Sequence, residues 1–270
     1  MKYSTERGDV VTHMNILKQT LIEKLRKKIS ASVLSMVLSS PIRCRKRITT
    51  VEGIENIPDS QAIFAPTHLS DQDMLLAGHS INKQNRSFSM VSQATNFEPF
   101  FMRTIMELSG KDRFLPISNR KTKNKIQGSE WVYGINPEDF QGFFQAMEMG
   151  NDIIIAGHRP VQDGKFPKKA GLGAIIMAYA TGEPLIPVVI DSKVKMQTKV
   201  KYLPEIELES LTSQEREIFN KWIGKSNSHK GSFINKKQIL EGVFAKMRKD
   251  AEKLMNAYKK ELPNVLEISK

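Results

Sequence analysis

A histidine followed five residues later by an aspartate is the strongest chemical feature of the sequence. The segment Pro66–Asp73 reads PTHLSDQD and follows the apolar stretch Gln61–Pro66, which is typical of a β-strand. A carboxylate beside a histidine fixes the imidazole tautomer and stabilises the imidazolium that forms when the ring takes a proton. The spacing therefore predicts a general base, His68 oriented by Asp73, although a purely structural hydrogen bond has the same signature. Without a serine or cysteine in a recognisable nucleophile elbow, the base would act directly on a substrate hydroxyl.

A metal site is the alternative use of these residues. Four side chains of metal-ligand type fall within twelve residues: His68, Asp71, Asp73 and His79. Their spacing matches no standard zinc pattern. We therefore predict that the site contains no metal.

Basic residues gather after a second apolar stretch, Asp152–Ala156. Gly157, His158 and Arg159 follow this stretch directly, and Lys165, Lys168 and Lys169 come next. Another basic group, between residues 113 and 125, includes Arg120. Guanidinium groups bind phosphate through paired hydrogen bonds. These groups predict a phosphate-binding site, and each is alternatively a solvated surface.

The middle of the chain alternates between strand-like and helix-like segments. The predicted strands are Gln61–Pro66, Phe88–Ser92, Arg113–Ile117, Asp152–Ala156, Leu185–Ile190 and Val200–Leu208. The predicted helices begin at Asp71, span Pro99–Leu108, 137–149, Lys169–Thr181 and Lys236–Leu262, and include one with a Thr212/Glu215 capping box. Strands separated by helices of 10–15 residues predict an α/β fold in which helices cover the sheet. Ligands of such folds bind beyond the carboxyl ends of the strands, where His68 and Arg159 would lie.

Length and composition exclude several classes of protein. The chain has 270 residues, 40% of them hydrophobic, which excludes overall disorder. Its single cysteine, Cys44, excludes a disulfide scaffold. No apolar stretch approaches the ~20 residues of a membrane-spanning helix, and the first residues show no secretory signal. We expect a cytoplasmic protein.

The net charge of +12 is concentrated at the two ends of the chain. Residues 1–50 carry 11 basic and 3 acidic side chains, and residues 221–270 carry 12 and 5. Apolar residues recur at every fourth position from Leu17 to Val37, which predicts a basic amphipathic helix. Such a helix suits an anionic membrane surface, but it could also pack on the main domain. We divide the chain into this N-terminal segment, residues 1–47, and one domain, residues 48–270.

The order of these features resembles the glycerolipid acyltransferase family, whose best-known members make phosphatidic acid from 1-acyl-glycerol-3-phosphate. The chain carries VEGIENIP (51–58), THLSDQD (67–73), RFLPISNR (113–120), IIAGHRP (154–160) and a stretch ending near Pro187. THLSDQD is similar to the H-x4-D block of the family. The resemblance covers about residues 48–192 and implies a mixed, largely parallel sheet.

The same resemblance implies a reaction and a set of site residues. His68 and Asp73 would be catalytic, and the residues that bind the substrate would be Ser70, Arg120, Gly157, Arg159 and Lys168. The acyl donor would be an acyl-coenzyme A or an acyl-carrier protein, and the acceptor a lysophospholipid or glycerol phosphate. Neither a cofactor nor a covalent acyl-enzyme is implied. The protein would lie peripherally on the inner face of the membrane.

Four residues depart from the family pattern. Thr67 replaces asparagine, Asn119 replaces an acidic residue, Ala156 replaces glutamate and His158 replaces threonine. Since the second and third blocks bind the acceptor in the family, the departures leave open another hydroxyl or amine acceptor, or a lapsed enzyme that only binds lipid. A basic nucleic-acid-binding protein is a further alternative, for which the sequence shows no recognisable motif.

We predict that residues 1–47 bind the protein to anionic bilayers. Each Lys or Arg near an anionic surface contributes roughly 1 kcal/mol, an attraction that salt screens, whereas insertion of the apolar stripe is not screened. Co-sedimentation with vesicles should therefore weaken with salt without vanishing, and neutral vesicles should bind less protein. Equal binding by the full chain and by a chain lacking residues 1–47 would contradict the prediction.

Overall fold

The computed structural model describes residues 48–70, 73–93, 114–117, 135, 137–161, 166–191, 198–224 and 233–262. The predicted N-terminal amphipathic helix and the predicted helix at Pro99–Leu108 lie outside these residues, as do Arg120 and Lys165. For the part of the chain that the structure describes, no helix is long and apolar enough to span a bilayer.

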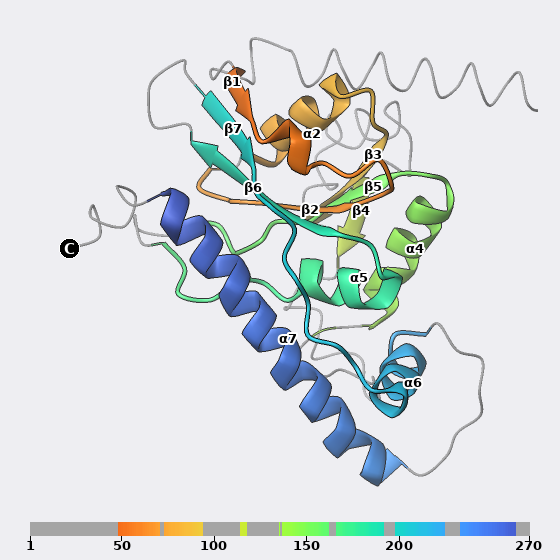
Figure 1. Ribbon diagram of the computed structural model, residues 1–270. Coiled ribbons are helices and arrows are strands. Elements are labelled where there is room, and N and C mark those ends of the chain that lie inside the picture. Colours follow the sequence, from red (N-terminus) through yellow and green to blue (C-terminus); the bar gives the residue numbers. More distant parts are fainter. Residues whose placement is uncertain are drawn as a thin grey trace, which may run out of the picture.

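Seven strands form one sheet in the described part of the chain (Figure 1). They are β1 (Ile48–Glu52), β2 (Ile63–Pro66), β3 (Phe88–Gln93), β4 (Phe114–Ile117), β5 (Asp152–Ile154), β6 (Leu185–Asp191) and β7 (Thr198–Tyr202). Their order is β1-β7-β6-β2-β5-β3-β4, and every pairing is parallel except β6 with β7. The prediction of an α/β fold with a mixed, largely parallel sheet is confirmed.

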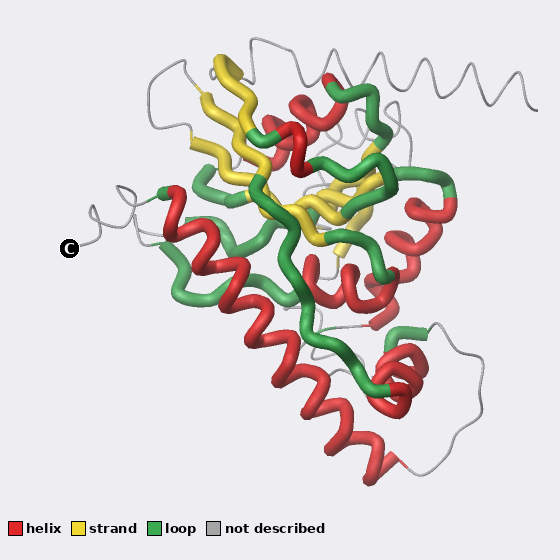
Figure 2. The backbone as a smooth tube through the Cα atoms, viewed as in Figure 1, coloured by secondary structure: helices red, strands yellow, loops and turns green. Residues whose placement is uncertain are grey.

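Helices cover both faces of this sheet (Figures 1 and 2). The helical elements are η1 (Ile54–Asn56), α2 (Asp73–Lys83), η4 (Pro137–Phe140), α4 (Gln141–Glu148), α5 (Gly173–Thr181), α6 (Ser213–Trp222) and α7 (Phe233–Glu261). Helix α2 covers one face, and α4, α5 and α7 cover the other. The strands β2, β5 and β6 thus lie between two layers of helices.

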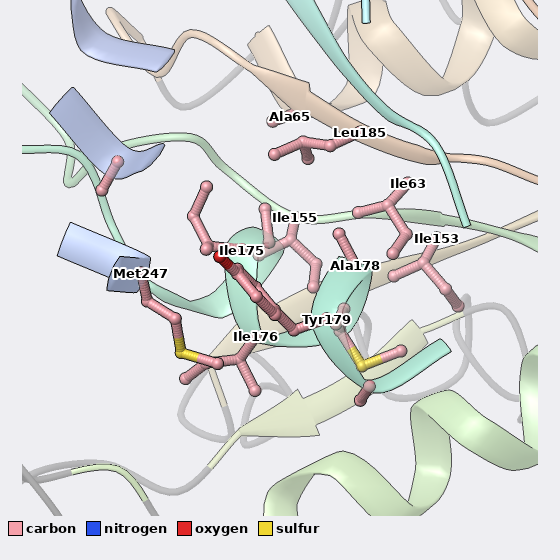
Figure 3. Close-up of a cluster of buried hydrophobic side chains, with 14 of the residues drawn as sticks. Ile63, Ala65, Ile153, Ile155, Ile175, Ile176, Ala178, Tyr179, Leu185 and Met247 are labelled. Atoms are coloured by element: carbon pink, nitrogen blue, oxygen red, sulfur yellow. The ribbon is translucent and has the colours of Figure 1, made fainter. Parts of the chain in front are cut away.

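The alternation of side chains along β2 explains the two cores. Ile63 and Ala65 face the larger cluster with α5 and α7, whereas Phe64 faces the smaller cluster with α2. Figure 3 shows Ile63 and Ala65 of β2 in one buried cluster with Tyr179 of α5 and Met247 of α7. Full burial of a large apolar side chain such as Ile63 or Met247 contributes about 1.5–3 kcal/mol to the stability of the fold. Because both faces are covered, β2 is apolar at every position, as buried parallel strands are.

Two of the predicted boundaries that the structure corrects have a clear physical cause. The strand predicted at Val200–Leu208 ends at Tyr202, two residues before Pro204, which has no N–H to donate to a neighbouring strand. The helix predicted from Lys169 begins at Gly173. The residues just before it are bonded to the loop after β5, since the Gly171 N–H donates to the Gly157 carbonyl at 2.8 Å.

Two local predictions are confirmed. Thr212 and Glu215 form both hydrogen bonds of a capping box at the start of α6. The predicted end of a helix at Thr181 is also that of α5, and Gly182 follows it with a positive φ of 78°, a conformation that glycine adopts without strain. Both signals depend on residues that are neighbours in the sequence.

We predict that Arg86→Met destabilises the fold by about 3–5 kcal/mol, because it leaves the buried Asp152 carboxylate without its cation. Arg86 donates to both carboxylate oxygens, at 2.7 and 2.6 Å, and ties the start of β3 to the start of β5. Lys201→Met is the control, because its partly exposed pair with Glu261 should be worth less than about 1 kcal/mol. Equal losses of unfolding free energy in the two variants, measured by urea unfolding, would contradict the prediction.

Candidate active site

The carboxyl ends of β2 and β5 bring the predicted catalytic and phosphate-binding segments together. The two strands are parallel neighbours, and the Gly157 N–H, beyond β5, donates at 2.8 Å to the carbonyl of Pro66, the last residue of β2. The main chain of His68 is held on both sides: its N–H donates to Nε2 of His158 at 3.1 Å, and its carbonyl accepts from the Val161 N–H at 3.2 Å. The loops after the two strands therefore form one bonded unit.

His68 presents one nitrogen as a base. Its Nδ1 lies 3.0 Å from the carbonyl oxygen of Ser70. Since a carbonyl oxygen only accepts hydrogen bonds, this contact selects the tautomer of the neutral ring that has its proton on Nδ1 and a lone pair on Nε2. The half-buried imidazole can therefore take a proton from a hydroxyl that reaches Nε2.

Asp73 organises the turn that holds His68. It is fully buried at the start of α2, and its Oδ2 accepts from the main-chain N–H groups of Leu69 and Ser70 at 2.7 and 2.8 Å. Its Oδ1 accepts from the Ser70 hydroxyl at 2.6 Å. These bonds connect Asp73 to the His68 ring through Ser70, whose carbonyl accepts from Nδ1. A direct bond between the two side chains stays a prediction.

His158 is the site residue that sequence reasoning missed, since the sequence showed it only as a departure from a family pattern. Its side chain is 2% exposed, its Nε2 accepts from the His68 N–H, and its Nδ1 donates to the Arg159 carbonyl at 2.6 Å. Burial lowers the pKa of His158 to about 4, a net effect that includes a rise from the bond to the Arg159 carbonyl and a smaller fall from the positive charge that His68 can carry. The ring is therefore neutral and accepts at Nε2.

Tyr258 of α7 contacts β2 through Ala65 and the loop after β5 through the His158 ring, and sequence reasoning did not identify it as a site residue. Its hydroxyl, fully buried, donates to the Ala65 carbonyl at 2.5 Å, and burial raises its pKa. A Cβ on Gly157 would lie 2.0 Å from that hydroxyl, so the packing of Tyr258 requires glycine there. The predicted role of Gly157, to let the acceptor approach, stays a prediction.

The remaining predicted residues divide between surface and core. Arg159 and Lys168 are exposed, in the segments that follow β5. Ala156 is half-buried and packs against the smaller apolar cluster. Its methyl side chain lies at the position where the family pattern has a carboxylate. The hydroxyl of Thr67 accepts from the Ile190 N–H at 2.9 Å, which joins β2 to β6.

Among the described residues, no cluster of His, Cys, Asp or Glu is arranged to hold a metal ion. Of the four candidate ligands, Asp71 lies outside the described residues. His79 lies half-buried within α2, and burial lowers its pKa. The absence of a metal from the working protein stays a prediction.

Comparisons with known proteins give one structural likeness. No family model matches the sequence, and no curated protein matches it. Among solved structures, the chain is similar to the crystal structure of the 1-acyl-sn-glycerophosphate (LPA) acyltransferase PlsC from Thermotoga maritima, with 15% sequence identity and a TM-score of 0.47. The match covers 80% of this chain and 87% of that chain. A likeness of this size does not establish a function.

We predict that His158 makes the fold sensitive to acid. Its pKa falls from an ordinary 6.5 to about 4 on folding, so the unfolded chain binds a proton that the folded chain does not. The stabilisation is complete above about pH 6.5, and roughly 3 kcal/mol is lost as the pH falls to about 4. Urea unfolding of the wild type and of His158→Gln, which cannot titrate, isolates the effect. The prediction fails if both proteins lose the same stability between pH 7 and pH 4.

Proposed function

We propose that this protein is an O-acyltransferase of phospholipid synthesis. It moves a fatty acyl group from the thioester of an acyl-coenzyme A or acyl-carrier protein to the hydroxyl of a phosphate-bearing glycerolipid such as 1-acyl-glycerol-3-phosphate. The observation that carries the proposal is the contact of His68 Nδ1 with the Ser70 carbonyl, which leaves Nε2 of the neutral ring free to take a proton. The main chain of His68 is bonded through His158 to the segment that bears Arg159. The order of the sequence blocks around these residues supports the same reaction.

The reaction follows from the protonation state of His68. Nε2 takes the proton of the acceptor hydroxyl as its oxygen attacks the thioester carbonyl, and a tetrahedral intermediate forms. The carbon–sulfur bond then breaks, and the imidazolium returns the proton to the departing thiolate. The products are an ester and a free thiol, and His68 is again neutral. The Ser70 carbonyl, held by Asp73, keeps the proton of the resting ring on Nδ1 throughout.

The basic residues suit the phosphate of the acceptor. Arg159 is exposed directly after His158, and Lys168 is exposed further along the same connection. Arg120 completes the set in the proposal. The Ser70 hydroxyl donates to Asp73 and thereby supports the turn at His68, and its role in binding the substrate stays a prediction.

A second candidate keeps the chemistry and changes the acceptor. Ala156 packs among apolar residues where the family has a glutamate, so one polar group of the acceptor site is lacking. This observation favours a different hydroxyl or amine acceptor, or a protein that binds lipid without transfer. The proposed location, peripheral on the inner face of the membrane, is the same for each.

We predict that His68→Ala lowers acyl transfer by about 10²–10⁴-fold, the usual contribution of a general base, while the protein stays folded. Asp73→Asn should also be severe, because an amide group cannot accept all three hydrogen bonds that the carboxylate now accepts. His79→Gln is the matched control, since this half-buried histidine lies outside the bonded unit. A His68→Ala protein that turns over within about threefold of the wild type would remove the general base from the proposal.

A further inference from the structure

The His158 ring bonds to two main-chain groups that belong to different halves of the site. Its Nε2 accepts from the N–H of His68 at 3.1 Å, and its Nδ1 donates to the carbonyl of Arg159 at 2.6 Å. Both ring nitrogens are thus used in a single tautomer, with the proton on Nδ1. A planar ring bonded at both nitrogens has little freedom to move.

The His158 ring connects the two loops beyond the ends of β2 and β5. The hydrogen bond from the Gly157 N–H to Pro66 is the last one that continues the pairing of β2 with β5. His158 follows Gly157 directly, His68 lies two residues after Pro66, and the imidazole of His158 spans the gap to the His68 N–H. The bond from the Val161 N–H to the His68 carbonyl closes the connection on the other side.

Aromatic packing holds the ring in its place. The centroid of Phe166 lies 4.7 Å from that of His158, and Tyr258 lies 5.8 Å away in an edge-to-face arrangement. Tyr258 is itself fixed by its bond to the Ala65 carbonyl. The imidazole is therefore confined by α7 and by the segment after β5, and it cannot follow a displacement of His68 without breaking these contacts.

We propose that His158 is a positioning residue that sets the placement of His68 relative to Arg159. The inference rests on the proposed function, in which His68 takes the proton of the acceptor and Arg159 binds its phosphate. Since the phosphate and the reacting hydroxyl belong to one acceptor molecule, the two protein groups must be spaced to match it. A displacement of about 1 Å can cost 10²-fold in rate.

Two variants of His158 separate positioning from packing. His158→Phe keeps an aromatic ring against Phe166 and Tyr258 but removes both nitrogens, which leaves the His68 N–H without its acceptor. His158→Gln restores an acceptor near the position of Nε2. We expect kcat to fall about 10–100-fold and the KM for the acceptor to rise in His158→Phe, with part of the kcat loss recovered in His158→Gln. The KM for the acyl donor should change little.

Amide hydrogen exchange at His68 provides a readout that does not depend on activity. The His68 N–H should be protected in the wild type, exchange faster in His158→Phe, and regain protection in His158→Gln. Tyr202→Phe is the control for stability alone, because it removes the buried hydrogen bond from Tyr202 of β7 to Ser80 of α2. It should lower the stability without changing kcat or the exchange of His68.

The outcomes distinguish the positioning role of His158 from the acyl transfer that the protein is proposed to catalyse. Wild-type kcat and acceptor KM in His158→Phe would overturn the positioning role, and so would unchanged exchange at His68. Equal effects of His158→Phe and Tyr202→Phe on kcat would also overturn it, since stability would then explain the loss. A wild-type protein that transfers no acyl group to any acceptor would instead refute the proposed function, which the exchange data do not test.

Discussion

The parallel pairing of β2 with β5 is the contact on which the candidate site depends. These strands come from segments about ninety residues apart, and both are buried on both faces. Since parallel strands end at the same edge, His68 and the Gly157–Arg159 segment meet there. The apolar layers on either side fix this edge in place, because α2 packs on one face and α5 and α7 pack on the other.

Polar side chains are buried at this edge of the sheet, and each needs hydrogen-bond partners there. The Asp73 carboxylate lies out of contact with solvent and accepts three hydrogen bonds from the turn before α2. The buried His158 ring uses both of its nitrogens. A buried polar group without a partner costs about 1–3 kcal/mol, so each of these bonds constrains the main chain around His68. The base is thus positioned by groups that also contribute to the stability of the fold.

The sequence predicted those features that local patterns determine. The apolar run at 61–66 with a histidine beyond it, the capping box at Thr212 and the end of α5 at Gly182 depend on residues within a few positions. The fold class followed from the alternation of strands and helices. The end of β7 was predicted too far along, because apolar residues continue past Pro204 although the pairing with β1 does not.

The roles of His158 and Tyr258 could not be predicted, because their partners are distant in the sequence. Ninety residues separate His158 from His68, and 193 separate Tyr258 from Ala65. A histidine after a strand fits a substrate ligand as well as a structural acceptor, and only the burial of the ring and its bonds to the main chain distinguish the two. Likewise, Gly157 suggested close approach of a ligand, and nothing in the sequence indicates that Tyr258 packs against this glycine.

The most direct test of the account measures the free thiol and the ester together. The wild-type protein is incubated with an acyl-coenzyme A, or with an acyl-carrier protein, and a panel of acceptors that includes 1-acyl-glycerol-3-phosphate and its analogue without phosphate. The account predicts one thiol for each ester formed, release that requires an acceptor, and a preference for acceptors that carry phosphate. Thiol release at the same rate without any acceptor, or no release with any acceptor on the panel, would contradict it.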